Sequence, residues 1–129
     1  MLQDDAWPVG WSQAVVVRGM ADVARAAGAG PDAIVLLSPP GAALWAGVNW
    51  WRALAEDARA RFPGRIAADV LDCGDAPGLA LAAIRMGQKS LILAVSAPGR
   101  DHVAAIAAAE GVTMLRGRPP TRDSNASLR

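Results

Sequence analysis

Two carboxylates and the single cysteine of this chain fall within four consecutive residues, Asp72-Cys73-Gly74-Asp75. A carboxylate can serve as a general acid or base, so one hypothesis is a small enzyme that uses Asp72 with Cys73 or Ser38 nearby. The same residues also allow a structural interpretation, in which Asp75 caps a helix and Cys73 is a small buried apolar side chain. Asp72 has no evident structural duty in the sequence. No second ligand-forming cluster accompanies them, so we predict no metal site, no cofactor and no defined catalytic set.

This loop belongs to a four-residue pattern that occurs three times, as Ser38-Pro39-Pro40-Gly41, Asp75-Ala76-Pro77-Gly78 and Ser96-Ala97-Pro98-Gly99. Each copy follows an apolar run and precedes a helical pattern. A Ser or Asp oxygen can cap a helix, proline is tolerated in the first helical turn, and glycine permits a tight turn. The pattern therefore predicts strand–turn–helix units whose loops share the carboxyl edge of a parallel sheet, where open α/β sheets hold their ligands.

The polar side chains at this edge suggest a site for a small anionic metabolite. Free N–H groups at a helix start attract anions, and Ser38 and Ser96 would add hydroxyl groups while Arg100 would add a positive charge. Together with Asp72 and Asp75, these residues form the ligand site predicted from the sequence. The loops contain neither of the glycine-rich phosphate-binding fingerprints, and proline removes one donor from each helix start.

Tryptophan is the other unusual feature, because the chain has five tryptophans and no tyrosine. Trp51 lies on the apolar stripe of a helical pattern, whereas Trp45 and Trp50 fall off that stripe and Trp7 and Trp11 lie near the N-terminus. Exposed tryptophan is enriched in binding hot spots. The four tryptophans off the stripe therefore predict a homo-oligomer interface. The alternative is that the N-terminal segment folds back and packs its two tryptophans against the other pair.

The elements that would position these residues alternate between strand and helix. We expect strands at 14–18, 33–37, 66–71, 91–95 and 112–115, and helices at 21–27, 44–62, 79–86 and 102–109. Residues 12–27 could instead form one helix. The arginines and acidic residues of the long helix suggest a solvated face with ion pairs at helical spacing. The alternation predicts a three-layer α/β sandwich with a mainly parallel sheet of about five strands and helices on both faces, flavodoxin-like or Rossmann-like.

The length of 129 residues fits one domain. We expect an N-terminal arm over 1–13, a single α/β domain over 14–117 and a flexible tail over 118–129. The net charge is +1 and the basic residues are scattered, which argues against nucleic-acid binding. No apolar run approaches the roughly 18 residues of a membrane span. The chain does not open with a basic segment and apolar core, and with one cysteine it is expected to be cytoplasmic.

Three stretches carry a loose resemblance to known proteins: residues 36–43, Leu-Leu-Ser-Pro-Pro-Gly-Ala-Ala; residues 49–54, Asn-Trp-Trp-Arg-Ala-Leu; and residues 71–78, Leu-Asp-Cys-Gly-Asp-Ala-Pro-Gly. Through them the chain resembles a family of small bacterial α/β proteins without an assigned activity. The resemblance covers residues 15–120 and implies an intact domain. It supplies no catalytic role.

Three functional hypotheses follow from the sequence. The leading one is a non-catalytic or vestigial domain that binds a small anionic metabolite at the carboxyl edge of the sheet. The second is a homo-oligomeric assembly subunit with a tryptophan-rich interface. The third is a small enzyme that uses Asp72 as acid or base.

Overall fold

The structure is a computed structural model that describes Pro8 and residues 14–122. Its strands are β1 (Ala14–Val16), β2 (Ile34–Leu37), β3 (Ile66–Asp72), β4 (Ser90–Ile92), β5 (Thr113–Leu115) and β6 (Thr121–Arg122). Its helices are α1 (Met20–Gly28), α2 (Ala42–Trp45), α3 (Val48–Arg61), α4 (Pro77–Arg85) and α5 (Arg100–Ala109). All neighbouring strands pair in parallel. The predicted α/β class with a mainly parallel sheet is confirmed, and the first segment is a strand rather than part of a helix.

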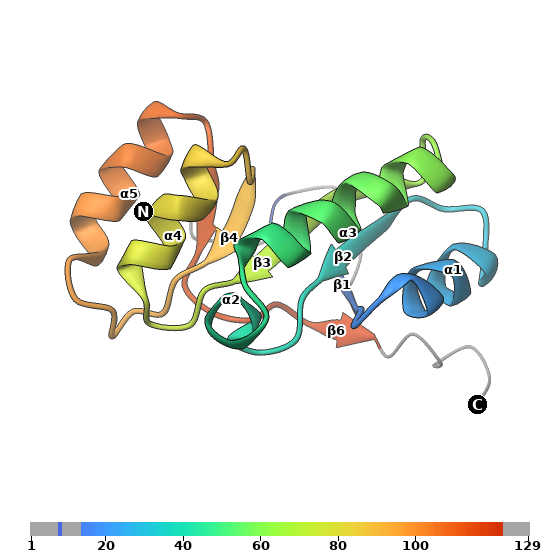
Figure 1. Ribbon diagram of the computed structural model, residues 1–129, viewed down its shortest axis with the longest axis horizontal. Coiled ribbons are helices and arrows are strands. Elements are labelled where there is room, and N and C mark those ends of the chain that lie inside the picture. The colour runs from blue at the N-terminus through green and yellow to red at the C-terminus, as the bar shows by residue number, and fades with distance from the viewer. Residues whose placement is uncertain (1–7, 9–13, 123–129) are drawn as a thin grey trace.

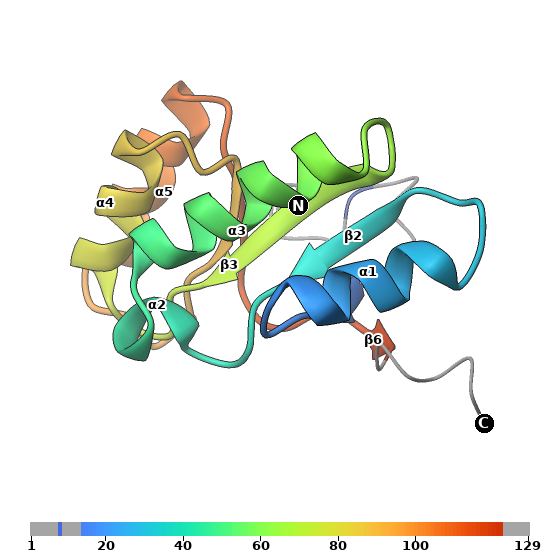
Figure 2. The same cartoon turned by 45° about the vertical axis from the view of Figure 1, so that its right-hand side comes forward.

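The strand order is β5-β4-β3-β2-β1-β6, so the first five strands lie side by side in chain order. A right-handed crossover between parallel neighbours that always advances in one direction places every helix on the same face. Helices α1, α3, α4 and α5 follow one another across one face of the sheet (Figures 1 and 2). The sequence predicted helices on both faces, and the described helices cover this one.

Successive residues along a strand point to opposite faces of the sheet, and each face has its own apolar cluster, as expected for parallel strands buried on both sides. On the helix-bearing face, Leu36 and Leu71 belong to the cluster that contains the fully buried Trp51. On the opposite face, Leu37 and Val70 belong to a second buried cluster. The strands therefore form the middle of the core, and α3 packs its apolar stripe against one side of it.

The long helix predicted over 44–62 is broken at Gly47. This glycine has a φ of +95°, which L side chains rarely adopt, and it separates α2 from α3. Val48 and Trp51 are buried as the helical spacing predicted, but Leu44 is 53% exposed because α2 has its own direction. Helix α2 contacts β3 and lies near the carboxyl end of that strand (Figure 1).

Strand β6 extends the regular structure beyond the predicted end of the domain at residue 117. It pairs with β1, where Thr121 is the partner of Ala14. Strand β5 lies at one edge of the sheet and β6 at the other, so residues 116–120 cross the whole sheet between them. The predicted flexible tail over 118–129 therefore includes two residues of strand, and residues 123–129 lie outside the described part.

The sheet forks at the amino end of β3. Strand β2 is paired with β3 from Ile66 to Val70, whereas the pairing of β4 with β3 is restricted to Leu71 and Asp72. Toward β4, the first part of β3 therefore has no strand partner in the described structure. We call this gap between the amino ends of β3 and β4 the fork.

Candidate functional site

The carboxyl edge brings together the loops that the sequence predicted. Strands β2, β3 and β4 are adjacent and parallel, and Ser38, Asp75 and Ser96 all follow their carboxyl ends. Asp75 and Ser96 are exposed, whereas Ser38 is fully buried. The Ser38 hydroxyl accepts the N–H of Asp72 at 2.9 Å and donates to the Pro39 carbonyl at 3.1 Å. The hydroxyl of Ser38 thus joins two neighbouring loops.

Asp72 has a structural duty that the sequence did not reveal. Its Oδ1 accepts the N–H of Gly74 at 2.8 Å, and its Oδ2 forms an ion pair with Arg118 Nη1 at 2.8 Å. Arg118 comes from the segment that crosses the sheet toward β6. Arg100 also makes an internal contact, because its Nε donates to the Leu93 carbonyl at 2.8 Å. These contacts hold the edge loops together.

Cys73 is fully buried beside Asp72. Burial, and to a lesser extent the negative charge of Asp72, raises the pKa of the Cys73 thiol to about 12. The thiol is therefore protonated at neutral pH, and the helix start that follows it does not produce a thiolate. This environment gives no support to a nucleophilic cysteine. Among the described residues, no group of three or more His, Cys, Asp or Glu side chains could hold a metal ion.

The same edge carries exposed apolar side chains. Trp45 and Val95 are each 65% exposed, and together with Leu44 they form what we call the edge patch. Its parts are connected through Gly74, which lies beside Leu44 and whose carbonyl accepts the N–H of Ala94 at 2.8 Å. The patch therefore spans α2 and the loop after β4.

The two described tryptophans of the predicted interface lie together. The ring centroids of Trp45 and Trp50 are 6.5 Å apart, and Trp50 is in turn 5.7 Å from the buried Trp51. Trp45 Nε1 donates to the Pro40 carbonyl at 3.1 Å, which fixes an otherwise exposed ring. Trp7 and Trp11 lie outside the described residues, so their packing against this pair stays a prediction.

A second candidate site lies at the opposite, amino edge, inside the fork. A cavity of about 570 Å³ opens there. Its polar walls come from α3, β3 and the starts of β4 and β5, and they include Arg52, Arg59, Asp69, Lys89, Ser90 and Thr113. The wall thus contains three cationic residues and one carboxylate. We call this space the fork cavity.

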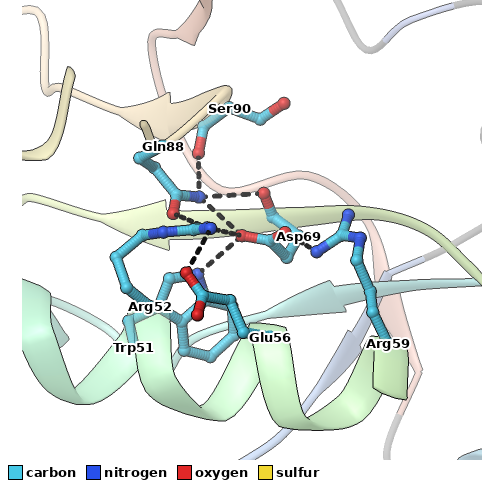
Figure 3. Close-up of polar contacts among 7 residues, drawn as sticks. All are labelled: Trp51, Arg52, Glu56, Arg59, Asp69, Gln88 and Ser90. Atoms are coloured by element: carbon cyan, nitrogen blue, oxygen red, sulfur yellow. Dashed lines mark hydrogen bonds and ion pairs between the residues drawn. The ribbon is translucent and has the colours of Figure 1, made fainter. Parts of the chain in front are cut away.

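Asp69 is the centre of the polar network beside the fork cavity (Figure 3). It is buried on β3, and its Oδ1 accepts hydrogen bonds from Trp51 Nε1 at 3.0 Å and Gln88 Nε2 at 2.7 Å. Arg59 pairs with the other carboxylate oxygen, and Arg52 Nη1 lies 3.6 Å from Oδ1. A buried carboxylate needs such partners because desolvation would otherwise be costly.

Gln88 is fully buried and closes the inner end of the fork. Its Nε2 also lies 3.0 Å from the main-chain carbonyl oxygen of Asp69 and 2.8 Å from that of Ser90, so its two N–H groups are shared among three acceptors. Its Oε1 accepts Arg52 Nη1 at 3.1 Å, while Arg52 Nη2 pairs with Glu56 at 3.3 Å. Gln88 thereby fixes the Arg52 guanidinium at the cavity wall.

Two cationic side chains of the cavity wall keep hydrogen-bond donors available. The Nε of Arg52 also has no partner, but it is fully buried and does not face the cavity space. The Arg59 side chain is 43% exposed and, among the described residues, it pairs with Asp69 alone. The ammonium group of exposed Lys89 pairs with nothing in the described part of the chain. Donors of this kind can bind the oxygens of an anion.

The sequence did not single out the fork cavity. Arg52 and Arg59 were expected on a solvated helix face, and the predicted ion pairs do form between Arg52 and Glu56 and between Arg61 and Asp57. However, Arg52 and Arg59 also turn toward Asp69. The available signal was Asp69 itself, a carboxylate inside an otherwise apolar strand, which must find buried partners.

No protein-family model matches the sequence, and no curated protein matches it either. No helix in the described part of the chain has the length and apolar character needed to span a membrane.

Proposed function

We propose that this chain is a small-molecule-binding domain that holds a small organic anion in the fork cavity. The observation that carries the proposal is a cavity of about 570 Å³ with Arg52, Arg59 and Lys89 in its wall. Its size falls within the roughly 300–1,000 Å³ of ligand pockets. The class of ligand is the one expected from the sequence, but the site is at the other edge of the sheet.

Electrostatics favour an anion in this cavity. One effect opposes an anion, because the carboxyl ends of α4 and α5 point to this edge and contribute partial negative charge. Their last carbonyls are capped by main-chain donors, including the N–H of Gln88 to Ala83 at 3.0 Å and that of Val112 to Ala107 at 2.8 Å. A capped helix end is a weaker and more screened influence than a nearby guanidinium group, so the three cations decide the preference.

The carboxyl edge is less suited to hold a metabolite. Ligands of open α/β sheets bind where the strand order reverses, because neighbouring crossovers then leave a crevice. No reversal occurs between β2 and β4. Ser38, Asp72 and Arg100 are also engaged in contacts within the protein.

The proposal is for binding without turnover. Asp69 is the only carboxylate in the cavity wall among the described residues, and donors from Trp51, Gln88 and Arg59 already occupy it. A general base needs a free lone pair directed at the substrate. Asp69 instead holds the arginines in place.

Isothermal titration calorimetry and thermal shift with a panel of organic carboxylates and phosphates test the proposal. We expect saturable binding to the wild-type protein and a loss of at least 10-fold in affinity for Arg59→Gln and for Lys89→Gln. The matched control is Arg61→Gln, on the same helix but outside the cavity wall, which should bind like wild type. Equal binding by all four proteins, or no binding by wild type, would overturn the proposal.

Self-association through the edge patch is a second candidate function, favoured by the exposure of its three apolar side chains, Trp45, Leu44 and Val95. Exposed tryptophan is common at the centre of interfaces. Sizing chromatography with light scattering should show an oligomer for wild type and a smaller mass for Trp45→Ser. Met86→Ser, which removes an exposed apolar side chain at the end of α4, is the control. A monomeric wild type at high protein concentration would contradict this candidate.

A further inference from the structure

The residues that line the fork cavity come from both faces of the sheet. Leu91 belongs to the core cluster on the helix-bearing face and Ile92 to the cluster on the opposite face. Because strand residues alternate, Ser90 directs its side chain to the face opposite the helices. Figure 3 shows the Ser90 side chain pointing away from Asp69, while the Ser90 carbonyl faces Gln88.

Thr113 occupies the matching position on β5. It is the register partner of Ser90, and Met114 and Leu115 after it alternate between the two clusters in the same way. The two hydroxyl groups are therefore neighbours on one face. Neither hydroxyl group forms a hydrogen bond with another described residue.

The cavity thus has two chemically different ends. Arg52 and Arg59 supply positive charge from the helix-bearing side, with Lys89 in the wall near them. Ser90 and Thr113 supply neutral hydroxyl groups on the other side, and the wall also contains small residues such as Ala67 and Gly111. None of the described residues in the wall is aromatic.

We propose that the ligand of the fork cavity is a polyhydroxylated anion of the sugar-phosphate or sugar-acid class. This inference rests on the proposed function. The anionic group lies against Arg59 and Lys89, and hydroxyl groups along the carbon chain exchange hydrogen bonds with Ser90 and Thr113. A hydroxyl group both donates and accepts, so it matches the serine and threonine side chains.

Size and shape exclude two simpler ligand classes. An inorganic ion would leave most of the 570 Å³ unfilled and would not reach the hydroxyl end. A nucleotide base prefers an aromatic face on which to stack, and the described cavity wall provides none. A compact polyol chain with one charged end fits both ends of the cavity.

Matched pairs of ligands test this inference. Gluconate and hexanoate have the same number of carbons and the same charge, but only gluconate carries hydroxyl groups along its chain. Ribose 5-phosphate and pentyl phosphate form the corresponding phosphate pair, and the two pairs together distinguish a carboxylate from a phosphate headgroup. We expect the hydroxylated member of at least one pair to bind at least 10-fold more tightly in calorimetry.

Ser90→Ala removes one of the two hydroxyl groups, and Thr113→Val replaces the other with a methyl group of similar size. Each variant should lower the affinity for the hydroxylated ligand by about 5- to 10-fold, as the loss of one hydrogen bond predicts. The affinity for the hydroxyl-free member of the same pair should not change. Ser96→Ala, which removes an exposed hydroxyl at the other edge, is the control. Circular dichroism and thermal melts identify any variant that has lost its fold, and Ser90→Thr then provides a version that keeps the hydroxyl.

The outcomes separate this inference from the proposed function. If the hydroxyl-free anions bind as tightly as their partners and both hydroxyl variants behave like wild type, the polyol assignment is overturned while the anion site stands. Tighter binding of adenosine monophosphate than of ribose 5-phosphate would also overturn it. If no anion binds, or if Arg59→Gln has no effect, the anion site itself fails.

Discussion

The side-chain amide of Gln88 lies 2.7 Å from Oδ1 and 3.0 Å from the main-chain carbonyl oxygen of Asp69. One side chain therefore satisfies both a buried charge and a strand carbonyl that has no strand partner toward β4. Its third hydrogen bond, to the Ser90 carbonyl, fixes where β4 begins. The fork stays open beyond this point because Gln88 completes the hydrogen bonding that a longer β4 would supply.

Gln88→Leu tests this relationship. The substitution keeps most of the volume but leaves two carbonyl groups and the Asp69 carboxylate short of donors. We expect the free energy of unfolding to fall by about 3–5 kcal/mol, the range for breaking a buried charged network. Urea denaturation followed by tryptophan fluorescence measures it. Lys89→Gln, an exposed neighbour, should change stability by less than about 0.5 kcal/mol. A loss below about 1 kcal/mol for Gln88→Leu would contradict the assigned role.

The ion pair between Asp72 and Arg118 should stabilise the segment that crosses the sheet. Both side chains are largely buried. We expect Asp72→Asn to lower the free energy of unfolding by about 1–3 kcal/mol, since it weakens the bonds to Arg118 and to the Gly74 N–H. A double-mutant cycle with Arg118→Gln should give a coupling energy above about 0.5 kcal/mol. The exposed Asp75→Asn is the control, and additive effects in the cycle would show that the pair contributes nothing.

The buried Cys73 thiol makes stability depend on alkaline pH. Its pKa is raised from 9.0 to about 12 in the folded protein, so the unfolded state loses its proton first. This contribution to stability is fully present below pH 9 and is lost as pH rises from about 9 to about 12. Denaturant melts across this range should show a steeper decline for wild type than for Cys73→Ala.

The same burial predicts that the native thiol resists a thiol-specific reagent at pH 8 and reacts once urea unfolds the chain. Rapid labelling of the native protein would contradict the buried position. Identical pH dependence of wild type and Cys73→Ala would contradict the raised pKa.

Gly74 in the loop after β3 and Gly78 in the helix that follows should respond to alanine in opposite ways. Gly74 has a φ of +57°, and a Cβ there would lie 3.0 Å from Leu44 Cδ1. Gly74→Ala is therefore expected to destabilise the protein by about 1–2 kcal/mol. Gly78, in the first turn of α4, has open space around it and ordinary φ, so Gly78→Ala should be neutral or stabilising by up to about 1 kcal/mol. Thermal melts of the two variants measure both signs.

The repeated Ser/Asp-x-Pro-Gly pattern was enough to predict the strands before it and the edge that its loops share. Local chemistry favours such a joint, because the proline and the glycine are consecutive. The predicted side-chain caps are wrong, however, since the N-cap residues of α2, α4 and α5 are Gly41, Ala76 and Gly99 and no side chain caps these helices. The break at Gly47 was missed for a related reason. The apolar spacing from Leu44 to Val48 continues across it, and only the backbone conformation of the glycine separates the two helices.

The layer arrangement and the fork could not be obtained from local pattern. Alternation of strands and helices requires crossovers, but it does not specify on which side of the sheet each new strand is added. Likewise, Asp69 and Gln88 meet only because β4 begins late relative to β3. The spacing of Asp69 and Gln88 in the sequence follows neither a helical nor a strand period, so it does not predict their contact. Only the position of Asp69, a carboxylate in an apolar strand, could have indicated that it has buried partners.

The position of β6 beside β1 has a consequence for how the chain folds. Strands β1 to β5 join in chain order, so each can be added to a neighbour of short sequence separation. Contacts of this kind form quickly. The pairing of Thr121 with Ala14 instead closes a loop that contains almost the whole domain, and it does so with a strand of only two residues. We expect this joint to form last and to be the first part of the sheet to open in hydrogen exchange.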